Sequence, residues 1–286
     1  MSHVIAQRNT AAAWDDAASG WHRNTALIHD WLHDATQRLL DAARIGPVAK
    51  VLDVAAGAGD QTRDIVRRIG NHGEVWVTDV SPQILALAQD SLRDVSGVHL
   101  QFQVADAQAL GMAGANLDAA ICRLGLMFCP SPLAALCEVR SALRPGGRFA
   151  ALVFSTPDAN PCVAITMRTA RQHAGLPDVD PFAAGSLLSL GRPGLAAQLF
   201  DDAGFSEIEV TPVAAPFRTA GVDDYVAFVR TSGSPVMEVL RHLTAARQAD
   251  AWADITRQLD RFSDAHGWEG PNELLLCSAL NRVGIA

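Results

Sequence analysis

Carboxylates and glycines with the spacing of a ligand-binding turn occur in one short run, Val51 to Asp60, which reads VLDVAAGAGD. Small residues let a backbone come close to a ligand, and glycine adopts positive φ angles without steric cost. A helix that begins after such a turn presents free N–H groups to that ligand. Asp53 would repel a pyrophosphate, so the run predicts a ligand that is cationic or carries an amino group.

This turn differs from the two familiar phosphate-binding turns. It lacks the Lys-Ser or Lys-Thr ending of a P-loop. Gly57-Ala58-Gly59 opens the dinucleotide-binding pattern, but Thr62 stands where that pattern has its third glycine. An oxidoreductase with a nicotinamide cofactor on a similar sheet is therefore the weaker alternative.

Further polar side chains follow the next three predicted strands. Asp79 lies 20 residues after Gly59, where a carboxylate can accept hydrogen bonds from both ribose hydroxyls. Asp106 and Arg123 end the third and fourth strands. Each has a structural alternative: a cap or turn for Asp53 and Asp79, an Asx turn for Asp106, and an ion pair for Arg123.

Short apolar runs alternate with helical patterns over about 105 residues in the middle of the chain. Such alternation implies parallel strands joined by crossover helices. The sequence therefore predicts an α/β fold with a doubly wound, mostly parallel seven-stranded sheet. The expected strands are residues 50–55, 74–78, 98–104, 117–122, 148–154, 207–213 and 274–279. The expected helices between and after them are residues 60–69, 82–88, 133–143, 163–173, 195–203, 223–229, 235–246 and 250–262.

The chain outside this alternating segment divides into two further parts. Residues 1–46 are predicted to form N-terminal helices that cover the ligand site, and residues 47–156 form the ligand-binding core. Residues 157–286 supply a helical cap, the helices of a substrate pocket and the last strands of the same domain. The apolar content in and next to that last part suggests a mostly nonpolar small molecule as substrate. The residues of this apolar group are Phe154, Phe182, Leu187, Leu188, Phe217, Tyr225, Phe228 and Met237.

The motifs together make a family resemblance specific. The chain resembles the class I S-adenosylmethionine-dependent methyltransferases, and within them the type that methylates a carbon of ubiquinone or menaquinone precursors. The matching stretches are Val51–Gly59, Val77–Ser81, Val104–Leu110 and Leu143–Phe149, in the order and spacing of the family. They lie within residues 48–156, a little over a third of the chain.

The resemblance implies S-adenosylmethionine as cofactor and a role for each matching position. Asp53, Ala55, Gly57 and Gly59 would frame the methionine part, although the family commonly has glycine where this chain has Ala55. Asp79 would hold the ribose, Val80 would pack against the adenine, and Asp106 and Ala107 would lie at the adenine amino group. Arg123 would border both cofactor and substrate. The fourth matching stretch, Leu143–Phe149, is expected to form a turn before a strand and to have a structural role only.

Methyl transfer needs positioning more than a fixed catalytic motif, so the sequence leaves the base open. Histidines of the helical segments are the candidates, with His22 and His173 as the first choices and His29 and His33 as further ones. His29 and His33 share a helix face, but no third ligand is evident in the sequence, so no metal site is predicted. Trp14, Trp21 and Met127 are the candidate lining of the substrate pocket, with an ordinary hydrophobic core as the alternative for the tryptophans.

Composition restricts the remaining classes. The net charge of −8 argues against a nucleic-acid partner. Five cysteines without Cys-x-x-Cys spacing predict neither a disulfide framework nor a zinc knuckle. No signal peptide and no membrane span are expected, so the predicted compartment is the cytoplasm. The oligomeric state stays open, with a homodimer among the compatible states. A relative that keeps the fold but not the activity is the other functional alternative.

Overall fold

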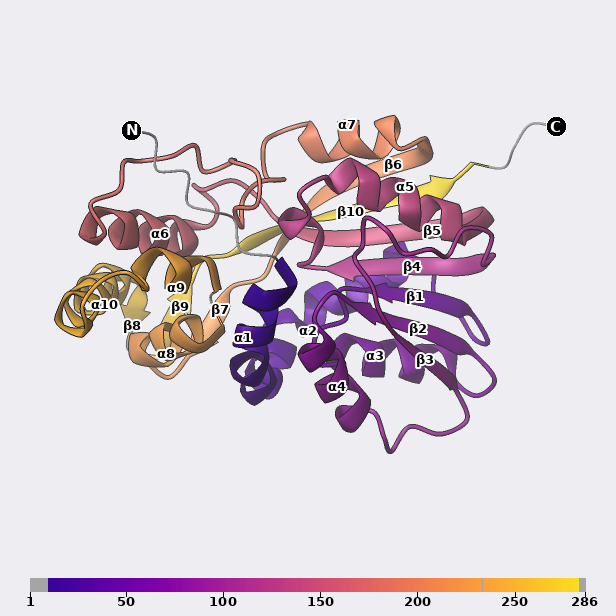
Figure 1. Ribbon diagram of the computed structural model, residues 1–286, viewed down its shortest axis with the longest axis horizontal. Coiled ribbons are helices and arrows are strands. Elements are labelled where there is room, and N and C mark those ends of the chain that lie inside the picture. The colour runs from indigo at the N-terminus through magenta and orange to yellow at the C-terminus, as the bar shows by residue number, and fades with distance from the viewer. Residues whose placement is uncertain (1–9, 233, 283–286) are drawn as a thin grey trace.

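The computed structural model describes residues 10–232 and 234–282. Its centre is a seven-stranded sheet with the order β3-β2-β1-β4-β5-β10-β6 (Figure 1). The strands are β1 (Lys50–Val54), β2 (Glu74–Asp79), β3 (His99–Val104), β4 (Leu117–Arg123), β5 (Leu143–Phe154), β6 (Phe205–Ala214) and β10 (Glu273–Asn281). Strands β1 to β5 are parallel to one another, and β10 is antiparallel to both β5 and β6. The predicted doubly wound, mostly parallel sheet is therefore confirmed.

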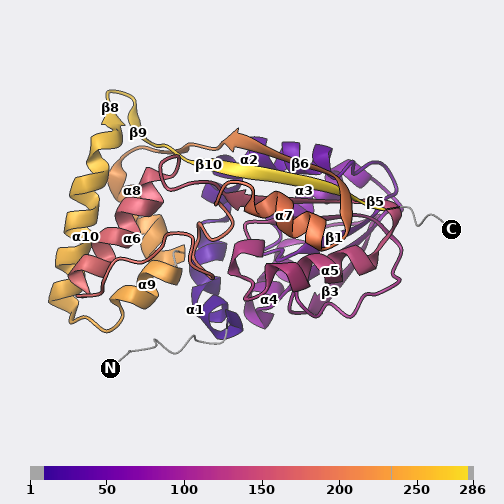
Figure 2. The same ribbon diagram turned by 90° about the horizontal axis from the view of Figure 1, so that it is seen from above.

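Helices cover both faces of this sheet because the crossover connections of parallel strands place them there (Figure 2). On one face α2 (Thr25–Ala42) packs beside α3 (Asp60–Ile69), and on the opposite face α5 (Pro132–Ala142) packs beside α7 (Leu195–Asp202). Helix α4 (Pro82–Ser91) lies against β2 and β3. The buried side chains of the sheet and these helices form one continuous hydrophobic core.

A second hydrophobic cluster lies beyond the carboxyl ends of the parallel strands (Figure 1). It holds Trp252, Leu259 and Trp268 together with the apolar faces of four helices. The elements of this cap are α6 (Pro161–His173), α8 (Val222–Ser232), α9 (Ser234–Leu240), α10 (Ala245–Leu259) and a small antiparallel sheet of β7 (Phe217–Thr219), β8 (Ser263–Asp264) and β9 (Gly267–Gly270). Helix α1 (Thr10–Arg23) lies between the cap and α4.

Several element boundaries differ from the sequence prediction. Strand β5 begins at Leu143, not at residue 148, because the segment expected to be a turn already pairs with β4 across a register shift. The predicted helices 235–246 and 250–262 are divided elsewhere: α9 ends at Leu240, and Thr244 caps α10 through its side chain. Strands β7, β8 and β9 were not predicted, since each is at most four residues long.

Two shorter segments complete the secondary structure. They are the 3-10 turns η1 (Leu126–Phe128), after β4, and η2 (Asp260–Phe262), after α10. Among the described residues, none of the helices combines the length and apolar character that a bilayer crossing requires.

Candidate functional site

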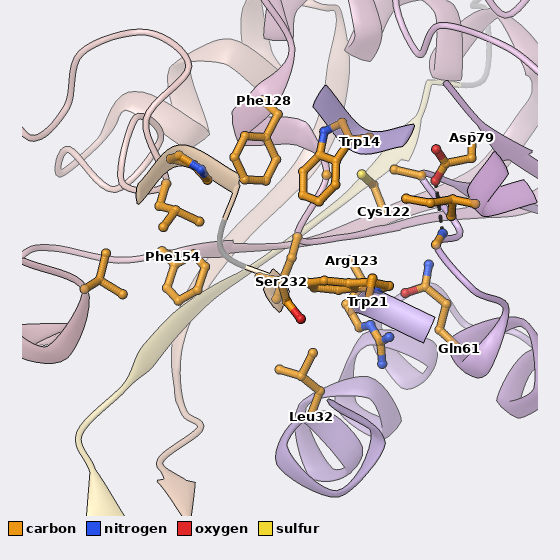
Figure 3. Close-up of a pocket in the computed structure, with 18 of the residues that line it drawn as sticks. Trp14, Trp21, Leu32, Gln61, Asp79, Cys122, Arg123, Phe128, Phe154 and Ser232 are labelled. Atoms are coloured by element: carbon orange, nitrogen blue, oxygen red, sulfur yellow. Dashed lines mark hydrogen bonds between the residues drawn. The ribbon is translucent and has the colours of Figure 1, made fainter. Parts of the chain in front are cut away.

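A cavity of about 460 Å³ lies between the carboxyl ends of the parallel strands and the cap (Figure 3). Ligands of open α/β sheets bind at this edge, because the connecting loops diverge there. The predicted site residues that line it are Ala55, Gly57, Asp79, Val80, Asp106, Ala107 and Arg123, together with Trp14 and Trp21. The cavity also extends into the cap, so that one space joins the glycine-rich turn to a group of aromatic side chains.

Asp79 is the charged group held most firmly at the turn side of the cavity. One of its carboxylate oxygens accepts a hydrogen bond from the Gly57 N–H at 3.1 Å, and the other accepts one from the Ser81 N–H at 2.9 Å. The side chain is nearly buried, and this burial raises the pKa of Asp79, although the backbone bonds oppose the rise. Each oxygen keeps a lone pair, so Asp79 can still accept hydrogen bonds from a ligand.

Asp53 is fully buried and does not line the cavity. Its carboxylate accepts hydrogen bonds from the side chains of Gln61 and Thr62, the second at 2.6 Å. Burial raises the pKa of Asp53 to about 7, while these two hydrogen bonds lower it. Because Gln61 does line the cavity, Asp53 acts on the site by holding the first turn of α3 in place. The sequence did not single out Gln61.

Gly59 lies behind the turn, outside the cavity lining. It is the N-cap of α3 with φ of +87°, and a Cβ atom there would lie 3.0 Å from the Ser91 hydroxyl. Glycine is required here by the close approach of α4 and the left-handed backbone. Gly59 was predicted to help frame the methionine part of the cofactor, and in the structure it shapes the turn from behind and is not part of the cavity lining.

Ala55 adopts φ of +54°, a conformation that L-residues other than glycine rarely adopt. Its methyl group fits because Gly125 lies opposite: a Cβ on Gly125 would lie 2.5 Å from the Ala55 Cβ. The alanine that departs from the common family turn therefore has a matching glycine on the fourth strand-end loop. Sequence spacing alone does not reveal this pair.

Arg123 combines the two roles that the sequence left open. Its guanidinium is buried and donates to the Asp60 carboxylate at 2.6 Å and to the Thr36 hydroxyl at 3.0 Å. The residue also lines the cavity. It is thus an ion-pair partner that ties α2 and α3 to the end of β4 and forms part of the wall. Asp106 likewise lines the cavity while it accepts a hydrogen bond from the Gln108 N–H at 2.9 Å.

Helix α1 covers the turn side of the cavity with two tryptophans. A Cβ on Gly57 would lie 3.1 Å from the Trp21 indole nitrogen, and Trp14 contacts the Phe128 ring with 5.1 Å between centroids. The helix is fixed at one end by Asp15, whose carboxylate accepts hydrogen bonds from the Ser81 hydroxyl and, at 3.3 Å, from the Gln83 N–H.

The other end of α1 is fixed to the cap. Gly20 contacts α8 so closely that a Cβ there would lie 1.9 Å from the Thr231 carbonyl oxygen. The Asn24 side chain donates to the hydroxyls of Thr231 and Ser232 at 3.0 and 3.1 Å. Helix α1 thus bridges α4 and α8 across the cavity.

The cap side of the cavity is lined mainly by aromatic rings. Phe217 lies at the centre of the group, with centroid distances of 4.9 Å to Trp31, 5.1 Å to Tyr225 and 5.0 Å to Phe228. Two buried polar atoms among these rings, the Thr166 hydroxyl and the Asn272 side-chain oxygen, have no hydrogen-bond partner among the described residues. Such atoms are costly to bury unless a ligand satisfies them.

Burial raises the pKa of the thiols and of the phenol in the lining. Burial raises the pKa of the Cys129 and Cys162 thiols to about 12, and it raises the pKa of Cys122 and of the Tyr225 phenol well above their usual ranges. Of the charged groups at the cavity, Arg123 is already paired with Asp60. The cap side therefore offers an apolar space with a few neutral hydrogen-bonding groups.

The structure does not bring the candidate bases to this cavity. His22 is exposed on α1, and His173 pairs with Asp254 of α10 at 3.1 Å; neither lines the cavity. His29 and His33 face α3 on the far side of α2. Met127 is fully buried behind the lining, and its neighbour Phe128 takes the position at the cavity instead.

Some of the apolar residues predicted to shape the substrate pocket line the cavity, and others do not. Phe154, Leu187, Phe217, Tyr225 and Phe228 line the cavity as expected. The other three named in the same apolar group do not: they are Phe182, which lies under the Arg192 guanidinium, Leu188, which is buried, and Met237, which is exposed.

Known proteins resemble this chain both in sequence and in fold. A ubiquinone/menaquinone biosynthesis C-methyltransferase from Burkholderia vietnamiensis is 34% identical over 149 residues, which are 52% of this chain and 61% of that protein. The chain spans about half to three fifths of the length of the curated relatives it matches.

Solved structures share the fold at low sequence identity. The phosphoethanolamine N-methyltransferase 2 of Haemonchus contortus, in complex with S-adenosylhomocysteine, superposes with a TM-score of 0.56 at 11% identity and covers 92% of this chain and 58% of its own. The [4+2]-cyclase SpnF superposes with a TM-score of 0.55 at 18% identity and covers 94% of this chain and 97% of its own. The model of the ubiE/COQ5 methyltransferase family matches residues 25–171, just over half of the chain. This chain therefore belongs to the ubiE/COQ5 methyltransferase family.

Proposed function

We propose that this protein is an S-adenosylmethionine-dependent methyltransferase whose acceptor is a small, mostly nonpolar molecule with a hydroxyl group, of the phenol or quinol type. One observation carries the proposal. A single cavity joins a nucleoside-binding edge, marked by Gly57 and Asp79, to an aromatic chamber that holds the unpartnered Thr166 hydroxyl and Asn272 oxygen. Donor and acceptor can therefore meet without crossing solvent.

The residues of the turn side fit the cofactor. Asp79 is oriented by two backbone N–H groups and can accept hydrogen bonds from the two ribose hydroxyls. Ala55 and Gly57 line the cavity and would leave room for the methionine part, and Val80, Asp106 and Ala107, which also line it, would contact the adenine. When bound, the cofactor supplies an electrophilic methyl group on a sulfonium.

The protein contributes mainly position and exclusion of water. Trp14 and Trp21 of α1 cover the donor side, and Phe217 and its neighbours hold an acceptor ring on the other side. Holding the two reactants in line is worth several orders of magnitude in rate. No histidine is among the described residues that line the cavity, so in this proposal the acceptor's own hydroxyl supplies the electron density, oriented by the Asn272 oxygen and the Thr166 hydroxyl. The donor then leaves as a neutral thioether, and the acceptor's proton is released to water.

Relatives support the acceptor class. Curated relatives that are 34% and 38% identical carry the name ubiquinone/menaquinone biosynthesis C-methyltransferase, so methylation of a ring carbon of a quinol-like acceptor is our first choice among C, O and N transfer. A nicotinamide-dependent oxidoreductase has no support from the family match. A fold-keeping protein with another activity is the remaining alternative, since one structural neighbour is a [4+2]-cyclase.

Calorimetric titration with S-adenosylhomocysteine tests the donor side. We expect saturable binding to the wild type and a loss of at least about tenfold in affinity for Asp79→Asn, because the charge-assisted hydrogen bonds to the ribose are weakened. Asp90→Asn, an exposed aspartate on α4, serves as control and should bind like the wild type. A wild type that does not bind this ligand would rule out the proposal.

Turnover of labelled cofactor with a panel of quinols, phenols and amines tests the acceptor side. We expect turnover with hydroxylated rings, and Thr166→Val should raise KM about 5–10-fold while affinity for S-adenosylhomocysteine stays unchanged. Binding of the cofactor without turnover on any acceptor would favour the alternative in which the fold has another activity.

A further inference from the structure

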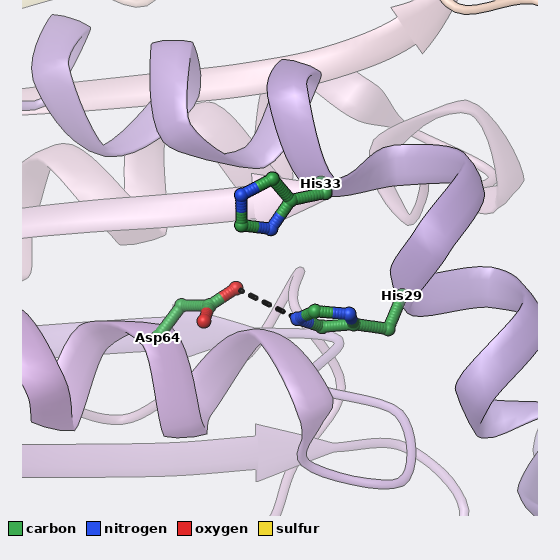
Figure 4. A group of neighbouring side chains, drawn as sticks. All are labelled: His29, His33 and Asp64. Atoms are coloured by element: carbon green, nitrogen blue, oxygen red, sulfur yellow. Dashed lines mark ion pairs between the residues drawn. The ribbon is translucent and has the colours of Figure 1, made fainter.

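Three side chains that can bind a metal ion meet outside the cavity, on the face of the sheet covered by α2 and α3. His29 and His33 extend from α2 toward Asp64 of α3 (Figure 4). One ligand atom from each of the three lies within 4.8 Å of the other two. The histidines are one helical turn apart and thus share a face of α2. The sequence showed this pair but not Asp64, because the third residue comes from another helix.

Asp64 has an oxygen that nothing in the described residues satisfies. Its side chain is only 3% exposed, and one carboxylate oxygen accepts a hydrogen bond from Arg67 at 2.8 Å. The other oxygen is buried without a hydrogen-bond partner and lies 3.8 Å from the His29 Nε2 atom. A buried carboxylate oxygen without a partner is unfavourable, and a cation between it and the imidazoles would satisfy it.

His29 has a carboxylate near each of its ring nitrogens. Its Nε2 atom faces Asp64, and its Nδ1 atom lies 3.7 Å from a carboxylate oxygen of Asp30, an ion-pair distance that is too long for a hydrogen bond. The exposed Asp30 side chain would have to move closer to accept a hydrogen bond from the far nitrogen, which would fix the ring and make the near nitrogen a better ligand. His33 is exposed, so a fourth position at the site can be taken by water.

We propose that His29, His33 and Asp64 form a binding site for a divalent transition metal of the zinc class. Two imidazole nitrogens and one carboxylate oxygen are a common ligand set for Zn²⁺. Tetrahedral geometry with bonds of about 2.0–2.1 Å needs ligand atoms about 3.3 Å apart. The three atoms lie within 4.8 Å of one another here, so metal binding would draw the two imidazole rings closer to the carboxylate.

The proposed role of this metal is to link α2 to α3. The same two helices supply the partners of Arg123, which are Thr36 on α2 and Asp60 on α3. The metal would therefore stabilise the wall of the cavity without contacting any ligand in it. The competing interpretation is a simple surface ion pair in which Arg67 alone balances Asp64.

Binding of Co²⁺ and Zn²⁺ to the chelator-treated, full-length protein distinguishes the two. We expect one Co²⁺ per chain with the strong visible absorption of four-coordinate cobalt, displaced by Zn²⁺. His33→Ala removes an exposed ligand and should fold normally, yet it should weaken binding at least about tenfold. Asp64→Asn should do the same, and His266→Ala, an exposed histidine of the cap, should bind like the wild type.

Thermal unfolding gives a second measurement that does not depend on catalysis. Zn²⁺ should raise the Tm of the wild type and of His266→Ala but not of His33→Ala, because only a ligand that binds the native state stabilises it. Equal affinities for the wild type, His33→Ala and Asp64→Asn would overturn the proposal, as would weak binding without a four-coordinate spectrum. These outcomes are independent of whether the protein transfers methyl groups.

Discussion

Asp53 and Asp79 lie at the ends of neighbouring strands, yet their side chains point in different directions and contact different parts of the molecule. Asp79 faces the cavity and is held by backbone N–H groups, whereas Asp53 faces α3 and is held by two side chains. Strand-end position predicts that such residues are near a ligand, but it does not give the direction of each side chain. That direction depends on which neighbours fill the space behind the turn.

The buried carboxyl of Asp53 predicts a pH dependence of stability. Its pKa is raised from 3.8 to about 7 in the folded protein, so the native state keeps the proton between these values while the unfolded state loses it. Stability from this group is fully present below pH 4 and is lost as the pH rises through 7. Asp53→Asn removes the titration. We expect the free energy of unfolding of the wild type, relative to Asp53→Asn, to fall by about 1–3 kcal/mol from pH 5 to pH 8.

Urea unfolding at the two pH values measures this difference, and other titrating groups cancel in the comparison. A difference that stays constant with pH, or that grows in favour of the wild type, would contradict a raised pKa for Asp53.

The left-handed backbone of Ala55 predicts an unusual response to glycine. Positive φ costs an alanine about 1–2 kcal/mol, so Ala55→Gly should leave the free energy of unfolding unchanged or raise it by up to about 1 kcal/mol. Ala56 is buried beside it without a positive φ, and Ala56→Gly should destabilise by about 0.5–1 kcal/mol or more. Chemical denaturation compares the two, and equal losses would argue against strain at Ala55.

Among the secondary-structure elements, helix α1 is the one that lies across the cavity between the core and the cap. It reaches from α4, through Asp15 and Ser81, to α8, through Gly20 and Thr231. Its tryptophans touch the ligand side, but its position depends on these two end contacts.

Gly20→Ala tests the contact with α8. Helix propensity alone predicts that alanine stabilises α1 by up to about 1 kcal/mol. The Thr231 carbonyl leaves no room for a Cβ, so we expect the opposite: faster proteolytic cleavage within residues 10–23 and weaker binding of S-adenosylhomocysteine. Ser19→Ala, next to it on the exposed face, should cleave at the wild-type rate. Slower cleavage of Gly20→Ala would show that the helices do not pack this closely.

Local signals predicted the elements of the sheet well and those of the cap poorly. Strand β1 and helix α3 were found because an apolar run, a glycine turn and an amphipathic helix follow each other directly. Strands β7 and β9 were missed because their partners lie about 50 residues apart in the chain, as in the pairing of Thr219 with Trp268. The same limit hid Asn272, which reaches the cavity from a segment far from the glycine-rich turn in the chain. Gln61 was missed for another reason: its partner Asp53 is only eight residues away, but spacing does not show that the two side chains face each other.

At the scale of the whole molecule there are two hydrophobic clusters, one on each side of the cavity, and the proposed function assigns the methyl donor to the first and the acceptor to the second. The first includes the sheet that supports Asp79, and the second includes the cap around Trp268. Trp268 is buried, stacks on Tyr225 with 4.6 Å between centroids, and donates its indole N–H to the Leu259 carbonyl at 2.8 Å. It is therefore the main anchor of the cap's packing.

Trp268→Ala should impair the acceptor side of the cavity, which the cap forms, more than the donor side, which the sheet forms. The loss of a large buried side chain costs about 3–5 kcal/mol, and this cost falls on the cap. We expect acceptor turnover to be lost, while affinity for S-adenosylhomocysteine changes by less than about tenfold. Asp79→Asn should show the reverse order of effects, with donor binding impaired first. Loss of donor binding in Trp268→Ala equal to that in Asp79→Asn would mean that the halves are not separable.

The position of β10 has a consequence for how the chain is made. This strand lies between β5 and β6 and, within residues 10–232 and 234–282, is the only sheet partner of β6. During synthesis, both hydrogen-bonding edges of β6 therefore stay unpaired until residues 273–281 have left the ribosome. An unpaired strand at this stage invites association with other nascent chains. A stop before Glu273 would leave the edges of β5 and β6 uncovered, so such products should aggregate instead of giving a smaller working enzyme.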